Sequence, residues 1–167
     1  FDGGYDVVIS GIDTPEAVTV ARQKRDQGRA TWAISYDYAK ACEGQGPACL
    51  GVPYFNWGPD FLRLAKAVQD KTWKQAFEWQ APAWKNINDH DTSPVGFMVG
   101  EGLSAENKAK LDAFVADLGS GKVNLFTGPL NYQDGKPFLK DGEKATDKQI
   151  WSLEQLLQGM EGQSSAK

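Results

Sequence analysis

The sequence has no excess of positive charge and no long apolar run. Its 18 lysines and arginines are outnumbered by 22 aspartates and glutamates, which gives a formal net charge of -4. The basic residues are scattered, so an electrostatically driven grip on nucleic acid or on an anionic membrane is excluded. No apolar stretch approaches the roughly 20 residues that span a bilayer.

The motifs that usually announce an enzyme are also missing. There is no G-x-G-x-x-G, no G-x-x-x-x-G-K-[ST] and no G-x-S-x-G motif, and there is no pair of histidines for a metal. His90, the sole histidine, lies in the polar run "NINDHDTS" and is interpreted as a solvated loop residue. We therefore expect no metal, no cofactor and no catalytic residue. The carboxylates Asp13 and Asp37 leave open an alternative in which they act as acid and base.

Cysteine is scarce, and its placement is informative. Cys42 and Cys49 are the only two, and the segment "EGQGPA" between them holds the glycines and proline needed to bend back. An intramolecular disulfide is therefore predicted, and it implies an oxidising compartment. Two reduced core thiols are the alternative.

Residues 4–37 predict one βαβ unit. "YDVVIS" and "ATWAISY" are short apolar runs suited to strands covered on both faces. Between them, "DTPEAVTVARQKRDQG" predicts a helix capped by Asp13 or Thr14, with Pro15 at its first position and Gly28 at its end. The crossover makes the two strands parallel neighbours, which indicates an α/β fold.

Ligands of open parallel sheets bind beyond the carboxyl ends of the strands. Gly11 follows the first predicted strand and lets a ligand approach the backbone, while Asp37 follows the second and can accept from hydroxyl or amine donors. Asp13 lies at the same end. The competing interpretation is that Gly11 only makes a turn and that the two aspartates only cap.

A third strand is predicted over "CLGVPYF", where Pro53 suggests an edge position or a crossing between sheets. The helix that follows, over "NWGPDFLRLAKAVQDKTW", has Pro59 near its start and apolar residues along one face. Phe55, Asn56 and Trp57 thus stand at another strand-to-helix junction. They are predicted to form the aromatic and amide side of a ligand pocket.

The remaining segments are a connection and a C-terminal region. The stretch from residue 74 to residue 100 has no helical period and reads as an extended connection, whose tryptophans are interpreted as packing residues. Ser104 is expected to cap an amphipathic helix with a stripe of Leu111, Phe114, Val115 and Leu118. Two Asp-Gly turns and a capping box from Thr146 to Gln149 are predicted beyond it.

Six stretches together resemble one family: "SGIDTPEAV", "AISYDYAKAC", "CLGVPYFNWGP", "INDHDTSPVGF", "SGKVNLFTGPLNYQDGKPFLKDGE" and "ATDKQIWSLEQLLQGMEG". They resemble the basic membrane protein family, also called purine nucleoside receptor-like, of bacterial ABC-transporter substrate-binding proteins. The resemblance implies a type I periplasmic binding fold, with two doubly wound parallel-sheet lobes closing over a ligand. This chain looks like the C-terminal half.

The resemblance also implies an organisation and a set of partners. Residues 1–48 would belong to the second lobe, residues 49–75 would cross and pack on the first lobe, and residues 76–167 would return to the second. The expected partners are a purine ligand, the missing N-terminal lobe and an ABC permease. A periplasmic or extracellular location follows, with a lipid anchor on a missing N-terminus. Alone, the chain is not expected to be a stable monomer.

Family receptors hold the ribose with a glycine, an aspartate and a lysine, and stack the base on aromatic rings. Gly11 and Asp37 match the glycine and the aspartate, but the lysine expected near Phe55 is absent. A free purine base, or a different clamp for the sugar, is therefore expected. The alternatives are a small α/β enzyme acting on a sugar or nucleoside through Asp13 and Asp37, and a ligand sensor for a signalling partner.

Overall fold

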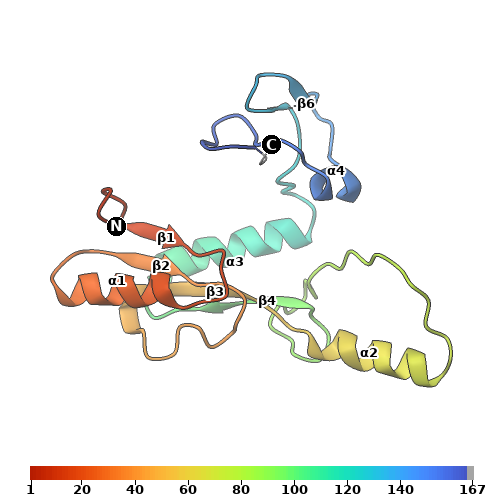
Figure 1. Ribbon diagram of the computed structural model, residues 1–167, viewed down its shortest axis with the longest axis horizontal. Coiled ribbons are helices and arrows are strands. Elements are labelled where there is room, and N and C mark those ends of the chain that lie inside the picture. The colour runs from red at the N-terminus through yellow and green to blue at the C-terminus, as the bar shows by residue number, and fades with distance from the viewer. Residues whose placement is uncertain (165–167) are drawn as a thin grey trace. The chain divides into compact units, whose positions relative to one another are not determined.

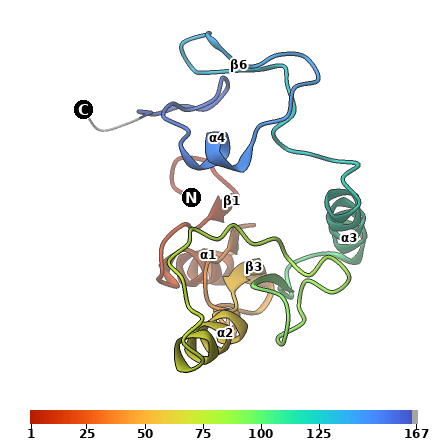
Figure 2. The same cartoon turned by 90° about the vertical axis from the view of Figure 1, so that its right-hand side faces the viewer.

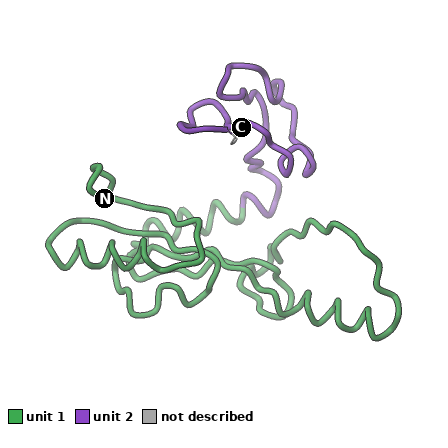
Figure 3. Tube along the Cα trace, in the orientation of Figure 1, with its two compact units in different colours: residues 1–116 green, residues 117–167 purple. Residues whose placement is uncertain are grey.

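The computed structural model describes residues 1–164, which form a mixed α/β structure. Figure 3 shows two compact units that divide within the third long helix, one over residues 1–116 and one beginning at residue 117. The first unit holds the main sheet and the second holds a small hairpin region. A sheet rich in parallel strands is compatible with a half domain of the periplasmic binding type. The predicted boundaries at residues 48 and 75 concern a second lobe and remain predictions.

The main sheet has four strands in the order β1-β2-β3-β4 (Figure 1). β1 pairs with β2 and β2 with β3 in parallel, while β4 runs antiparallel to β3. The parallel crossover predicted over residues 4–37 is confirmed. The strands are β1 Val7–Ile9, β2 Trp32–Ile34, β3 Cys49–Phe55 and β4 Val95–Val99.

Helix α1, Glu16–Asp26, covers one face of this sheet and supplies much of its core. Val18 and Ala21 on the helix are fully buried against Ala33 of β2 and Cys49 of β3. Full burial of an aliphatic side chain is worth about 1.5 to 3 kcal/mol, so this cluster anchors the crossover. The expected side-chain cap is wrong, because Pro15 occupies the N-cap position and no side chain caps the helix.

β1 differs from the strand that its sequence predicts. Val7 and Ile9 are 45% and 71% exposed, although the continuous apolar run "YDVVIS" indicates a strand covered on both faces. β1 is an edge strand of the main sheet, with β2 as its neighbour. The apolar run therefore forms an edge strand whose alternate side chains are exposed within the first unit.

β3 is an interior strand despite Pro53, so the expected edge position is wrong. Ser35 N donates to Gly51 O, and Asp37 N donates to Pro53 O, which shows that odd residues of β3 face β2. Pro53 has no N–H to donate between these two bonds. The regular β2-β3 ladder accordingly ends at Gly51 and resumes further on as an isolated bridge.

Helix α2, Gly58–Gln69, leaves the end of β3, with Pro59 in its first turn as predicted. None of its residues is buried, and Phe61, Leu62 and Val68 are largely exposed. The connection over residues 70–94 then runs from the end of α2 to the start of β4 without a helix or strand of its own (Figure 2). Its extended character is as predicted, whereas β4 itself was missed.

Short elements complete the two units. Ser104 Oγ accepts from Asn107 N and caps α3, Ala105–Gly119, as the sequence predicts, although no residue of its apolar stripe is fully buried. Both Asp-Gly pairs make turns, with φ of 84° at Gly135 and 72° at Gly142. The capping box of Thr146 and Gln149 is also confirmed. The further elements are η1 Gly46–Ala48, β5 Leu130–Asn131, β6 Pro137–Leu139 and α4 Asp147–Trp151.

Candidate functional site

The three parallel strands of the main sheet end at one edge, which we call the carboxyl edge. The segments that follow them are residues 10–15, 35–45 and 55–57, and the antiparallel β4 starts at the same edge. Ser10 N donates to Ile34 O, so the first segment lies beside the second. Asp37 bridges Tyr54, so the second lies beside the third. All six predicted ligand-binding residues therefore stand on neighbouring segments of one edge.

Asp37 has an unusual main chain and an unengaged side chain. Its φ is +70°, in the left-handed region that Asp and Asn tolerate better than other non-glycine residues. Its N–H donates to Pro53 O at 3.0 Å, and its carbonyl oxygen accepts from Phe55 N at 3.1 Å. Within residues 1–164, its carboxylate has no hydrogen-bond or ion-pair partner. The residue thus holds the strand junction with its backbone and leaves two acceptor oxygens free.

A series of aromatic rings begins beside Asp37. The edge of the Tyr36 ring meets Phe55 with centroids 5.9 Å apart, and Phe55 lies 5.3 Å from Trp57. Trp57 in turn stacks on Phe61 at 6.0 Å and an interplanar angle of 19°. Phe55, Trp57 and Phe61 are all exposed. Exposed, mutually supported rings of this kind offer a platform for a flat ligand.

Phe61 was not singled out as part of this platform by the sequence. It was assigned to the apolar face of α2, yet it lies four residues after Trp57, where the helix begins. Residues four apart on a helix are neighbours on its surface. That spacing is the signal that would have found the pair.

A hollow of about 290 Å³ opens between the start of α1 and the segment after β2. Asp13, Tyr36 and Tyr38 are among the residues that line it. The two tyrosines are the sequence neighbours of Asp37. Gln45, on the far side, accepts a hydrogen bond from Arg22 Nε at 3.2 Å, which ties this segment to α1. The Cys42–Cys49 disulfide, predicted from the sequence, joins the same segment to β3.

Gly11 stands in open surroundings at the end of β1. A methyl group at its Cα would meet nothing within 4 Å, and its φ is not in the left-handed region. The position is therefore accessible to a ligand. Within residues 1–164, nothing in the backbone at this point demands a glycine.

The side chain of Asn56, which was predicted to contribute an amide to the ligand pocket, donates to the protein backbone instead. Its amide nitrogen donates both hydrogens, one to His90 O and one to Ser93 O, each at 2.8 Å. Its main-chain N–H donates to Pro94 O, also at 2.8 Å. Asn56 thus fastens the end of the 70–94 connection to the carboxyl edge. Both donor hydrogens of its side chain are occupied.

A second asparagine holds the same connection. Asn88 Oδ1 accepts from the Tyr54 hydroxyl at 3.1 Å and from Phe97 N at 2.9 Å, and Asn88 Nδ2 donates to Phe97 O at 3.0 Å. Burial raises the pKa of Tyr54. A methyl group on Gly96 would overlap both the Tyr54 ring and Asn88, so the strand needs glycine at that position. Neither Asn88 nor Tyr54 was singled out from the sequence, because the contact joins residues 34 apart.

His90 is exposed, as its polar surroundings in the sequence predict, and its ring stacks on Tyr54 with centroids 6.2 Å apart. The neighbouring Asp89 accepts from Asp91 N, and this hydrogen bond lowers the pKa of Asp89. At the start of α1, a hydrogen bond with the Thr14 side chain lowers the pKa of Glu16. Both carboxylates thus stay ionised to lower pH than a free carboxylate does.

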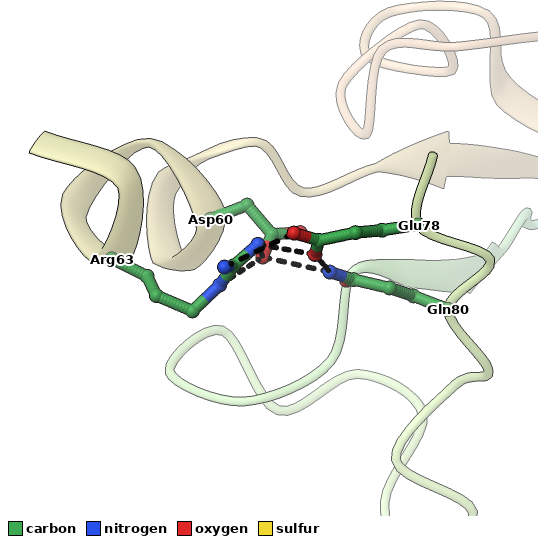
Figure 4. Close-up of polar contacts among 4 residues, drawn as sticks. All are labelled: Asp60, Arg63, Glu78 and Gln80. Atoms are coloured by element: carbon green, nitrogen blue, oxygen red, sulfur yellow. Dashed lines mark hydrogen bonds and ion pairs between the residues drawn. The ribbon is translucent and has the colours of Figure 1, made fainter. Parts of the chain in front are cut away.

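The connection is also tied to α2 by a small polar network (Figure 4). Arg63 donates to Asp60 and to both carboxylate oxygens of Glu78, and Gln80 Nε2 donates to Asp60 and Glu78. This network keeps residues 78–80 against the helix. The tryptophans of the connection, Trp73, Trp79 and Trp84, are 42% to 52% exposed, so none is a core residue of the first unit.

A larger hollow, about 450 Å³, lies between β4, α3 and residues 84–88. Its lining is mainly apolar and includes Trp84, Phe97 and Leu111. No residue predicted to bind ligand lies in it. Among the described residues, no group of three or more His, Cys, Asp or Glu side chains is placed to hold a metal ion, and no helix is long and apolar enough to cross a membrane.

No protein-family model matches the chain. Among curated proteins, the chain is similar to a purine-binding protein of Brucella abortus (strain 2308), with 30% identity over 161 residues. The alignment covers 96% of this chain but 42% of the relative, so the chain spans less than half the length of that protein.

Proposed function

We propose that the carboxyl edge binds a purine between this chain and a second lobe, without turnover. The observation that carries the proposal is the unpaired carboxylate of Asp37, which lies on the segment next to the one that holds the exposed rings of Phe55 and Trp57. A purine offers a flat π-face for such rings and N–H or O–H donors for such a carboxylate. The similarity to a protein named for purine binding supports the same ligand class.

In this proposal, Gly11 allows close approach, and Asp13 and Asp37 accept from the ligand. Phe55 and Trp57 stack on the base. Asn56 acts indirectly, because its hydrogens already hold the 70–94 connection beside these rings. The lysine expected near Phe55 is missing from the sequence, so the base contributes more of the affinity than the ribose does.

We place the first lobe on the exposed apolar face of α2. Phe61, Leu62 and Val68 each present a large apolar side chain to solvent, and exposed apolar surface of this kind often marks an interface. The relative is more than twice as long as the aligned region, which leaves room for a lobe of similar size. The complete receptor then works outside the cytoplasm, where the Cys42–Cys49 disulfide is stable, and hands its ligand to an ABC permease.

The test is a titration of the full-length protein that carries this chain. Adenosine, guanosine and adenine are added in turn, and the heat of binding and the thermal shift are measured. Chromatography of the recovered ligand then detects any chemical change. Saturable binding with unchanged ligand is the expected result; conversion of the ligand would favour an enzyme acting through Asp13 and Asp37, and no binding of any purine would overturn the proposal.

A further inference from the structure

Negative charge is poorly balanced at the carboxyl edge. The carboxylates of Asp13 and Asp37 have no ion-pair partner within the part of the chain that the structure describes. Lys40 lines the same hollow as Asp13. Its Nζ lies 3.7 Å from Oε1 of Glu43, so the lysine already has a carboxylate partner. Among the residues that line this hollow, a ligand therefore meets the unpaired carboxylate of Asp13 and one lysine that already has a carboxylate partner.

Several hydrogen-bond donors at the carboxyl edge already donate to groups within the protein. The side-chain amide of Asn56 gives both hydrogens to His90 O and Ser93 O. The backbone N–H groups of Asp37 and Phe55 are used in the bridge between the second and third segments. These donors are not available to a ligand, whereas the unpaired carboxylates of Asp13 and Asp37 are acceptors that suit a ligand with donors or with positive charge.

The aromatic rings at the same place have the complementary property. Phe55, Trp57 and Phe61 are exposed, and each contacts the next. The face of an aromatic ring carries partial negative charge and attracts cations, most strongly for tryptophan. Rings and carboxylates therefore favour the same sign of charge in the ligand.

From these contacts we infer that the edge prefers a purine that carries a positive charge, such as an N-methylated purine cation, over the neutral form of the same size. The inference rests on the proposed function, because it concerns the charge of the purine bound there. A cationic ring stacked on Trp57 gains from the face of that ring, and the unpaired carboxylate of Asp37 on the neighbouring segment attracts the same charge. We expect the charged purine to bind about 10- to 100-fold more tightly than its neutral counterpart.

Two isomeric methyladenosines allow a charged purine and a neutral purine of the same size to be compared. 1-Methyladenosine is a cation at neutral pH, and N6-methyladenosine has the same heavy atoms and is neutral. Both are titrated at pH 7 into the full-length protein by calorimetry, with adenosine as the reference. Tighter binding of 1-methyladenosine is the expected result, and the preference should shrink as salt is added.

Asp37→Asn tests the origin of the preference. Asparagine is nearly isosteric and tolerates the positive φ of this position, so the variant removes charge while it keeps the bridge. It should bring the two isomers to within about 3-fold of each other. The matched control is Asp26→Asn, an exposed carboxylate at the opposite end of α1, paired with Arg22, which should leave the preference unchanged.

The outcomes separate the two proposals. Equal affinity for the two isomers, in a protein that binds adenosine, overturns the charge preference and leaves purine binding standing. A preference that survives in Asp37→Asn overturns the role of that carboxylate. Absence of binding to all three compounds overturns the proposed function, and the charge preference with it.

Discussion

Asp37 and Tyr54 form an isolated parallel bridge that joins the end of β2 to β3. The bridge holds the backbone of Asp37 at a φ of +70°, while the carboxylate points to no partner among residues 1–164. The structural and the ligand-binding interpretations of Asp37 are therefore not alternatives. The left-handed backbone explains why aspartate fits the position, and the free carboxylate leaves it available to a ligand.

Substitutions at Asp37 should separate these two contributions. Asp37→Ala loses the carboxylate and forces alanine into the left-handed region, which costs about 1 to 2 kcal/mol of folding stability. Asp37→Gly loses the carboxylate without that strain. We expect both variants to weaken purine affinity about 10- to 150-fold, and only Asp37→Ala to lower the denaturant midpoint clearly. Wild-type affinity in Asp37→Gly would remove the residue from the site.

Asn56 should be more important for stability than its position at a strand end suggests. Asn56→Ala removes two hydrogen bonds and leaves His90 O and Ser93 O without that donor, at a cost of about 1 to 3 kcal/mol. Asn56→Asp should be worse, because it places a carboxylate against two carbonyl oxygens. Chemical denaturation measures both. Asn107→Ala, whose side chain lies exposed on α3, is the control, and a destabilisation equal to that of the control would contradict the role.

The disulfide should be present in the isolated protein. Counting thiols on unfolded, non-reduced protein should find none of the two cysteines reactive. The segment that it closes is short, so the Cys42→Ser, Cys49→Ser double variant should lose at most about 2 to 3 kcal/mol of stability. Purine affinity should fall as well, because the disulfide holds the segment that lines the hollow beside Asp13. Two reactive thiols per chain would refute the bond.

Tyr54 should make the fold sensitive to alkaline pH. Burial raises the pKa of Tyr54 above its ordinary value of 10.0, so the unfolded chain releases this proton at lower pH than the folded one does. The contribution is fully present below about pH 10 and is lost as the pH rises through the pKa of the folded state. Denaturation of the wild type and of Tyr54→Phe from pH 8 to 11 isolates it. The wild type should lose more stability over that range, and parallel curves would contradict the effect.

In the absence of the proposed second lobe, the isolated chain should not remain a simple monomer. The α2 residues Phe61, Leu62 and Val68 form an exposed apolar stripe that needs cover. Light scattering of the isolated chain should therefore show association, and Leu62→Glu with Val68→Lys should reduce it. A monodisperse 18 kDa wild-type species that melts cooperatively would show that the stripe needs no partner.

Local chemistry explains what the sequence could predict. Pro59 at the start of α2, Ser104 before α3 and the Thr146–Gln149 capping box act within one helical turn, so their spacing is readable from the chain. The parallel crossover was also readable, because two short apolar runs flank one helical segment that ends before Gly28. The three strand ends that make up the candidate site follow from that topology.

Contacts between distant segments explain what could not be predicted. β4 is a short run inside a connection without period, and it becomes a strand because β3 offers it a partner. Asn56 looked like a ligand donor because nothing in the sequence reveals that His90 and Ser93 lie beside it. Pro53 suggested an edge strand because proline has no N–H to donate to a neighbouring strand. The sequence does not show that the regular pairing of β2 with β3 ends at Gly51, before Pro53.

The hydrogen bonds between the Asn88 side chain and the Phe97 backbone make the two edges of the main sheet unequal as sites for a further strand. In β4, the N–H and C=O groups of Phe97 point away from β3 and are taken by Asn88, and the outward carbonyl of Val95 accepts from Ser93 Oγ. In β1, by contrast, Val7 and Ile9 point theirs away from β2 and are not blocked by any described residue. An added strand, from a second lobe, another copy or an aggregate, would therefore find the first half of β4 blocked by side chains and the outer edge of β1 open.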